Sequence, residues 1–226
     1  MTEDNSQILV TLAILGGTGK EGAGLAMRWA LNGYRVIIGS RSADKAITRA
    51  GEMNEELGGD YITGMANEDA AKAANLIVLS VPYSAHQPTL QSVAEFCQGK
   101  IVVDLTVPLQ APEFMSVNLP EGGAAALEAQ AVLGSGATVI AAFQNVSSVK
   151  LKKVNEPVDC DVLVCGDVGN AKQEVIQLVK AAGMRGIDAG ALKNAVAVES
   201  LTPVLLYINK TYKVKGAGIR ITGVED

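Results

Sequence analysis

Short apolar runs alternate with longer, helix-like segments over the first 145 residues. The apolar runs have the length of strands, whereas the segments between them repeat their apolar residues with a helical period. The expected strands lie at residues 8–15, 35–39, 61–65, 75–81, 100–105 and 138–143. Repeated βα units of this kind predict a doubly wound parallel sheet, covered by helices on both faces.

The pattern changes after about Asn145. A charged connector with one proline, VKLKKVNEPVD, is followed by a short strand, a helix, a second short strand and a long helical segment from Leu192 to about Tyr212. A connector of this composition is typical of a domain edge. We therefore expect a larger domain over residues 1–150 and a small α/β domain over 151–226. The final GAGIRITG fits either a last strand or an extended arm.

The composition adjusts this picture. Hydrophobic residues make up 48% of the 226 positions but aromatic residues only 4%, so the core must consist of Val, Ile, Leu and Ala, as buried parallel strands prefer. The net charge of −5 argues against nucleic-acid binding, which needs a basic surface. The acidic start, MTEDNSQ, is unlike a secretory signal, and no apolar stretch is long enough to span a bilayer.

The three cysteines, Cys97, Cys160 and Cys165, are odd in number, and their spacing is poor for a metal site. Reduced thiols in a cytoplasmic protein are the simplest interpretation, and we predict no bound metal.

The glycine-rich segment GTGKEG, residues 17–22, fits the pattern G-x-G-x-x-G. It follows the first predicted strand and precedes a predicted helix, which is the context that a dinucleotide-binding loop requires. In such a loop Gly17 makes the tight turn, Gly19 lets the backbone approach a pyrophosphate, and Gly22 allows close packing of helix and strand. A glycine-rich turn without a ligand is the alternative. Glu21 after Lys20 excludes a Walker loop.

The second predicted strand ends in Ser40-Arg41, where an NAD-binding unit carries an acidic residue. The first acid, Asp44, lies within the following helix-like segment. A guanidinium, a hydroxyl and the nearby Lys45 suit a 2′-phosphate, so we predict NADP rather than NAD. The alternative is a helix start with Ser42 as N-cap and solvated cations.

No catalytic side chain stands out. The one histidine, His86, lies inside a helix-like segment, where a structural role is more common than a catalytic one. The chain contains no Tyr-x-x-x-Lys pair. A nicotinamide enzyme without an acid or base suggests an acceptor that manages its own proton.

The chain resembles the F420-dependent NADP reductases over essentially its whole length. The resemblance rests on LGGTGKEG, VIIGSRSADKA, ITGMANEDAAKAANLIVLSVP, KIVVDLTVP, AAFQNVS, DVLVCGD and DAGALKNAVAVESLTPVLLYIN, in the order and spacing of that family. It implies direct hydride transfer between NADPH and the 5-deazaflavin coenzyme F420. It also implies that the first domain binds NADP and that the second completes the F420 pocket.

The resemblance further implies the binding residues. Those expected to contact NADP or F420 are Gly17, Thr18, Gly19, Lys20, Glu21, Ser40, Arg41, Lys45, Val81, Pro82, Val103, Asn145, Val146, Ser147 and Ser148. The segment from Glu199 to Leu206 would complete the F420 pocket. Some family members read HTIPA where this chain reads QNVSS, so backbone contacts there are firmer expectations than side-chain contacts.

Two further expectations concern the C-terminal third. Its cations, Lys193, Lys210, Lys213, Lys215 and Arg220, could hold the anionic tail of F420, although a solvated helix face explains them as well. Its long apolar helix suggests a homodimer. Two other functions stay open at this point: an NADPH-dependent reductase of a small imine, ketone or flavin, and an NADP-binding sensor without turnover.

Overall fold

The structure, a computed structural model, describes residues 10–224. Its centre is a six-stranded parallel sheet in the order β3-β2-β1-β4-β5-β6. The strands are β1 (Thr11–Leu15), β2 (Arg35–Ser40), β3 (Ile62–Ala66), β4 (Leu76–Leu79), β5 (Ile101–Asp104) and β6 (Thr138–Ala141). All six lie where the apolar runs predicted them; positions 8 and 9 of the first run lie outside the described residues.

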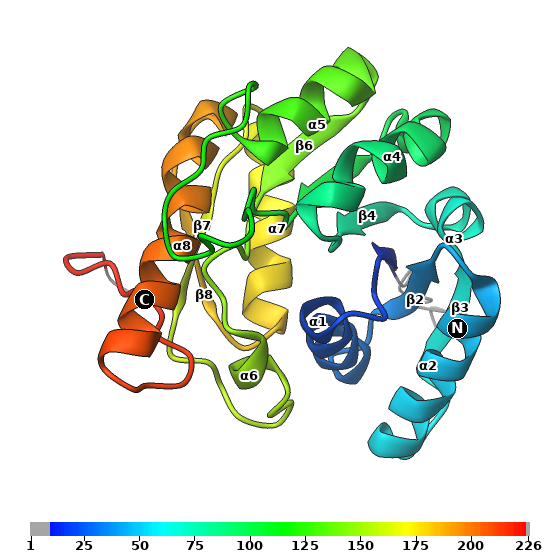
Figure 1. Ribbon diagram of the computed structural model, residues 1–226. Helices are drawn as coiled ribbons and strands as arrows, with labels where there is room; N and C mark the ends of the chain where they lie inside the picture. The colour runs from blue at the N-terminus through cyan, green and yellow to red at the C-terminus, as the bar shows by residue number, and fades with distance from the viewer. Residues whose placement is uncertain (1–9, 225–226) are drawn as a thin grey trace, which may run out of the picture.

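Helices cover both faces of this sheet, as the alternating pattern predicted (Figure 1). The helices are α1 (Lys20–Leu31), α2 (Ala43–Leu57), α3 (Asn67–Ala73), α4 (Tyr83–Val93), α5 (Ala125–Leu133), α6 (Ser148–Leu151), α7 (Gly169–Ala181) and α8 (Ala195–Thr211). Successive strand residues point to opposite faces. Leu12 and Ile14 of β1 therefore share a core cluster with Trp29 of α1, while Leu15 shares another with Leu90 of α4.

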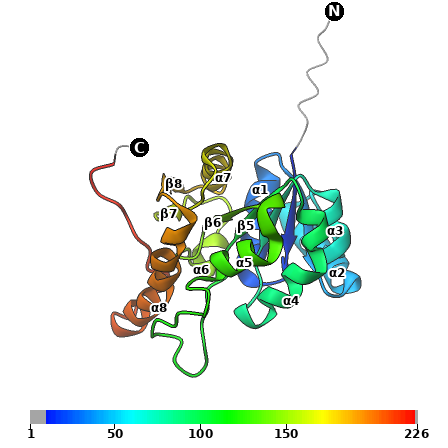
Figure 2. The ribbon, with the colours of Figure 1, turned by 90° about the horizontal axis from the view of Figure 1, so that it is seen from above.

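A second, two-stranded parallel sheet consists of β7 (Asp161–Val164) and β8 (Arg185–Asp188). One antiparallel bridge between Ala141 and Cys165 joins it to the end of β6. After α8 the chain forms an extended arm over residues 213–224, which contains no strand. Figure 2 shows that α8 and this arm lie at the side of the molecule opposite α2 and α3. The arm returns to β7, where the Asp161 amide donates a hydrogen bond to the Ile219 carbonyl at 2.8 Å.

The two parts of the chain share one core across residue 150. The Trp29 ring donates a hydrogen bond to the Leu178 carbonyl of α7 at 2.8 Å and makes an edge contact with Phe143. The division into residues 1–150 and 151–226 therefore stays a prediction from the sequence pattern. Within residues 10–224, no helix has both the length and the apolarity to cross a membrane.

Candidate functional site

The glycine-rich loop lies at the carboxyl edge of the main sheet, beside the end of β2. Leu15 pairs with Gly39 in the parallel register, and the Gly16 amide donates to the Gly39 carbonyl at 3.0 Å. Gly19 is the N-cap of α1, and no side chain caps its first turn. The free N–H groups of this turn are therefore available to an anion, and the adjacent strand β2 ends at Ser40.

The three motif glycines differ in what surrounds them. A Cβ atom at Gly17 would lie 2.8 Å from the Ile14 carbonyl oxygen and 2.9 Å from the Ile38 side chain. A Cβ at Gly22 would lie 3.0 Å from the Cα of Gly17. At Gly19 the nearest atom would be the Gly16 oxygen at 3.4 Å, so this face of the loop is open. Gly17 and Gly22 thus serve packing, and Gly19 leaves room for close approach of a ligand.

Arg41 and Lys45 are exposed at the end of β2 and in the first turn of α2. Neither makes an ion pair with another residue in the range 10–224. Ser42 occupies the N-cap of α2 without a side-chain cap; instead its own amide donates to the Ser40 hydroxyl at 3.3 Å. The two cations beside the glycine loop are therefore available to a phosphate.

A cavity of about 690 Å³ opens beside this loop. Its walls come from the residues that follow β1, β4, β5 and β6 and from α8 and the arm. Of the predicted site residues, those that line it are Gly19, Lys20, Glu21, Val81, Pro82, Asn145, Val146, Ser147 and Ser148. The carboxyl edge of the sheet thus brings together four separate segments, as a doubly wound fold allows.

The other predicted residues lie elsewhere. Gly17 and Thr18 belong to the loop next to the cavity, and Ser40, Arg41 and Lys45 lie at the end of β2. Val103 is fully buried inside β5 and does not line the cavity. β5 ends at Asp104, and the lining begins with Leu105. The predicted strand, residues 100–105, ends at Leu105, so its last residue is the one that lines the cavity.

Several lining residues were not among the predicted site residues. They are Ser80, Leu105, Thr106, Val107, Leu109, Gln144, Val149, Thr202, Leu205, Leu206, Asn209, Val214, Lys215, Gly216 and Ala217. The expected segment 199–206 does contribute Thr202, Leu205 and Leu206. Glu199 does not line the cavity; it is 2% exposed and accepts hydrogen bonds from the Ala125 and Ala126 amides at the start of α5.

Glu21 is the acidic residue of the glycine loop. Desolvation by burial raises the pKa of its carboxyl to about 8. This shift favours the neutral carboxyl, which repels an anion less than a carboxylate does.

His86 lies behind the cavity wall. Its side chain is 1% exposed, and its Nε2 lies 2.7 Å from a carboxylate oxygen of Asp104, which is fully buried. Burial by itself would lower the pKa of His86, but the hydrogen bond and charge of Asp104 outweigh it and raise the pKa. His86 does not line the cavity, which agrees with the structural role expected of it.

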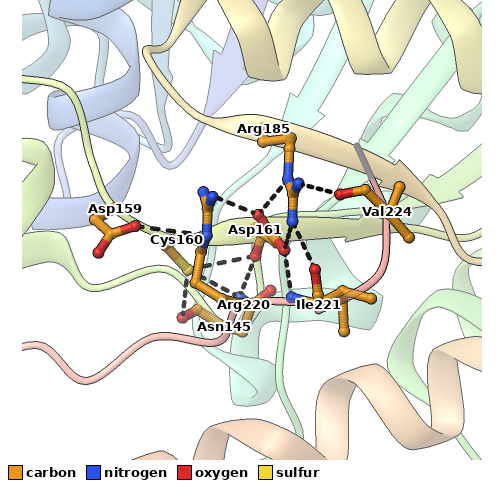
Figure 3. Close-up of polar contacts among 8 residues, drawn as sticks. All are labelled: Asn145, Asp159, Cys160, Asp161, Arg185, Arg220, Ile221 and Val224. Atoms are coloured by element: carbon orange, nitrogen blue, oxygen red, sulfur yellow. Dashed lines mark hydrogen bonds and ion pairs between the residues drawn. The ribbon is translucent and has the colours of Figure 1, made fainter. Parts of the chain in front are cut away.

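A clasp around Asp161 holds the arm against the small sheet (Figure 3). We use this name for Asp161, Arg185, Arg220, Ile221 and Val224. The buried carboxylate accepts hydrogen bonds from Arg185 Nε at 2.9 Å, Arg185 Nη2 at 2.7 Å and the Ile221 amide at 2.6 Å. Arg185 also donates to the carbonyls of Ile221 and Val224. The same arm begins with the cavity residues 214–217, so the clasp supports one wall of the site.

The described residues, 10–224, contain no group of three or more His, Cys, Asp or Glu side chains placed to hold a metal ion. All three cysteines are free and buried.

Residues 11–108 match a family model described as coenzyme F420-dependent NADP oxidoreductase. The F420-dependent NADP reductase of Methanothermobacter thermautotrophicus is 40% identical over 226 residues, which cover 97% of each chain. The reductase of the same name from Methanocaldococcus jannaschii is 42% identical over 95% of this chain and 99% of its own.

Among solved structures, a hypothetical protein from Sinorhizobium meliloti aligns with a TM-score of 0.68 at 22% identity, covering 82% of this chain and 86% of its own. At that identity it supports the fold alone. The near-complete match to the two archaeal reductases goes further and confirms the resemblance seen in the motifs: this chain belongs to the F420-dependent NADP reductase family.

Proposed function

We propose that this protein catalyses reversible hydride transfer between NADPH and the deazaflavin coenzyme F420. The observation that carries the proposal is one continuous cavity that begins at the N-terminus of α1 and ends at α8 and the arm, in a chain of this family. Such a cavity has room for two rings, and its volume lies in the range of small-molecule sites.

The NADPH end of the site fits the glycine loop. The uncapped first turn of α1 offers N–H groups to the pyrophosphate, and the open face of Gly19 allows its close approach. Arg41, Lys45 and the Ser40 hydroxyl would bind the 2′-phosphate. These residue roles follow from exposure, charge and position on neighbouring strands.

Replacing Arg41 by alanine should lower NADPH affinity at least tenfold, because one charge-assisted contact contributes about 1.5–3 kcal/mol. Binding of NADH should hardly change, since NADH lacks the 2′-phosphate. Titration calorimetry with both coenzymes checks this. Arg35, exposed at the start of β2, offers a control, because Arg35→Ala should leave both affinities unchanged. Equal losses of affinity for NADPH and NADH would contradict the assignment of Arg41 to the 2′-phosphate.

Replacing Gly19 by alanine should weaken NADP binding roughly tenfold with little loss of stability. The new methyl group meets open space in the protein but occupies the approach of the pyrophosphate, and the loss of a favourable N-cap costs less than about 1 kcal/mol. Gly17→Ala is the matched comparison: its Cβ overlaps Ile14 and Ile38 and should cost about 2 kcal/mol of unfolding free energy. Thermal unfolding and NADP titration of both variants separate the two roles; unchanged binding by Gly19→Ala would contradict this interpretation.

The ring-binding end of the site is mainly apolar. Val81, Leu105, Val146, Leu205 and Leu206 line it. With both coenzymes bound, a hydride passes between the nicotinamide ring and the central carbon of the deazaflavin. The protein's part is to hold the two rings face to face and to exclude water. No histidine or tyrosine within the described residues lines the cavity, so no such group competes for a proton.

Among the cations proposed for the F420 tail, Lys215 lines the cavity, whereas Lys193, Lys210 and Lys213 do not. Arg220 lies in the clasp, 3.4 Å from Asp161 and 3.6 Å from Asp159. We expect Lys215→Gln to raise the F420 Michaelis constant several-fold, because the variant loses about one exposed ion pair with the ligand. The constant should also become less sensitive to salt. Lys193→Gln should have no effect. Steady-state rates at low and high salt give the F420 Michaelis constant of each variant. Equal Michaelis constants for Lys215→Gln and Lys193→Gln would reject a tail site at Lys215.

The proposed reaction is tested by mixing the purified protein with NADPH and oxidised F420 and following the deazaflavin absorbance. We expect rapid bleaching with NADPH and little with NADH. Oxidation of NADPH by an imine, ketone or flavin without reaction of F420 would favour another reductase. Stoichiometric NADP binding without turnover would favour a sensor.

We further infer a homodimer in the cytoplasm. The last turns of α8 and the start of the arm expose Val204, Tyr207, Tyr212 and Val214, and large apolar side chains gathered on one segment are a feature of protein interfaces. Three buried free thiols suit a reducing compartment. Light scattering after size-exclusion chromatography measures the mass directly, and a monomer at micromolar concentration would contradict the dimer.

A further inference from the structure

Two consecutive amide side chains at the carboxyl end of β6 each carry a buried oxygen without a hydrogen-bond partner. Gln144 and Asn145 are both 3% exposed, and both line the cavity. Gln144 Oε1 and Asn145 Oδ1 have no partner, and among buried side-chain atoms of the described residues Asn67 Oδ1 alone shares this condition. Asn67 lies at the start of α3 and does not line the cavity. Buried polar atoms are normally paired, so two orphaned acceptors in one cavity indicate a ligand that donates.

The Gln144 amide has only one possible orientation. Its Nε2 donates to the Asp104 carbonyl at 2.7 Å. Rotation of the amide by 180° would place two oxygens at that distance, which is repulsive. Asp104 is itself held, because its carboxylate binds His86 and accepts the Thr106 amide at 2.9 Å. Oε1 is therefore the acceptor atom of this side chain, and it has no partner within the described residues.

The Asn145 amide is oriented in the same way from the other side. Its Nδ2 donates to the Asp161 carbonyl at 2.7 Å and lies 3.2 Å from Cys160 Sγ (Figure 3). Asp161 is held by the clasp, so the position of Asn145 is coupled to the arm. Both hydrogens of this amide are committed, and Oδ1 is left as an acceptor.

A ligand atom that meets Gln144 Oε1 or Asn145 Oδ1 must donate a hydrogen bond, because both oxygens are acceptors. A phosphate or carboxylate oxygen has no proton to donate, so neither can satisfy these oxygens. A ring carbonyl is excluded for the same reason. A hydroxyl or an amide or imide N–H fits, and of these the amide and imide N–H groups belong to the rings themselves.

We propose that Gln144 and Asn145 form an acceptor pair that recognises an amide N–H of a ring bound in the cavity, and that this contact orients the ring for hydride transfer. The inference rests on the proposed function. Two rings of that reaction carry such a group: nicotinamide has a carboxamide NH2, and the deazaflavin has an imide N–H between two carbonyls. The pair is a positioning and specificity element, and it takes no part in bond making.

Binding measurements with edited ligands test the proposal without turnover. The first arm compares NADP+ with its 3-acetylpyridine analogue, in which a methyl group replaces the NH2 and the carbonyl is kept. The second compares F420 with an N3-methylated F420. Calorimetry of the wild-type protein should show roughly tenfold weaker binding of the edited ligand in at least one of the two comparisons, as expected when a buried polar group loses its partner. The comparison in which the edited ligand binds more weakly identifies the ring.

Variants then assign the contact to the pair. Gln144→Met and Asn145→Leu remove the acceptors. For the coenzyme whose edited form binds the wild-type protein more weakly, at least one variant should bind the natural and the edited ligand with equal affinity. A purely structural role would instead weaken both ligands by the same factor and leave their ratio at the wild-type value. Thermal unfolding shows which variants are folded, and the wild-type comparison stands even where a variant is not.

Binding of NADP+ and F420 without discrimination in either arm would overturn the acceptor pair and leave the proposed function intact. The same holds if both folded variants keep the wild-type ratio. Failure of the wild-type protein to bind either natural coenzyme would overturn the proposed function, and this inference with it.

Discussion

Replacing Arg28 by methionine is expected to lower the free energy of unfolding by roughly 3–5 kcal/mol, which is the range for loss of a buried hydrogen-bond network. Arg28 lies in α1, is 2% exposed, and forms no ion pair with any residue in the range 10–224. Its guanidinium donates to five backbone carbonyls instead. They belong to Lys150, Leu151, Lys153, Glu156 and Ala182.

The cost is large because methionine can fill the space but cannot donate. The carbonyls at the end of α6, in the connector that follows it and at the end of α7 would lose a partner in a place that water does not reach easily. The same segment continues the cavity residues Ser147 and Ser148, so NADP affinity should fall as well. Lysine at this position keeps the charge but has fewer donors, and should recover only part of the stability.

Denaturant unfolding followed by circular dichroism measures these differences. The control is Arg35→Met, an exposed position at which we expect a change within about 0.5 kcal/mol. A loss below about 1 kcal/mol for Arg28→Met would show that the carbonyls find other partners.

Replacing Asp161 by alanine is expected to cost a similar amount, roughly 3–5 kcal/mol, because it removes the buried carboxylate that Arg185, Arg220 and the Ile221 amide share. The side chain of Arg185 is 16% exposed, and that of Asp161 is fully buried. The arm would lose its side-chain anchor on β7, which would loosen the cavity wall at residues 214–217. The Michaelis constant for F420 should therefore rise more than the turnover number falls.

The pH dependence of stability offers an independent check of Asp161. Hydrogen bonds from Arg185 lower its pKa most; burial opposes them, and the Ile221 amide and the charges of Arg185 and Arg220 add to the lowering. A carboxylate with a lowered pKa stabilises the folded state fully above its unfolded value of about 4, and this contribution is lost as the pH falls toward the folded value. Wild-type protein should lose stability below about pH 4 by an amount that Asp161→Asn does not show. Parallel curves for the two proteins would contradict the clasp.

Much of the fold could be read from local patterns. Apolar runs of strand length marked all six strands of the main sheet, because a strand buried on both faces must be apolar along its length. The glycine loop was equally visible, since Gly17, Gly19 and Gly22 occupy a fixed spacing between a strand and a helix. The last segment was left open as strand or arm, because one hydrogen bond to β7 and the clasp decide its conformation, and neither leaves a local pattern.

The binding residues divide in the same way. Ser147 and Pro82, which the resemblance to the family implied, do line the cavity, because they lie in loops that leave the carboxyl edge of the sheet. Val103, which the resemblance implied as a contact, is buried inside β5, whereas Leu105, two residues later, lines the cavity. Of the arm residues 214–217, Lys215 alone was named, as one of five cations that could hold the F420 tail; nothing in the sequence shows that the chain returns to the cavity after α8.

The sequence by itself determined the doubly wound sheet, the dinucleotide loop and the cations that favour NADP, because periodicity, glycine spacing and strand ends are local properties. It also determined the family, through motifs that match along the whole chain. Only the tertiary structure decided how the cavity closes and which polar atoms in it stay free. Arg28 reaches carbonyls more than 120 residues away, and the amides of Gln144 and Asn145 are oriented by backbone carbonyls 40 and 16 residues away. Hydrogen bonds over such separations depend on how the elements pack, and no local pattern of residues specifies them.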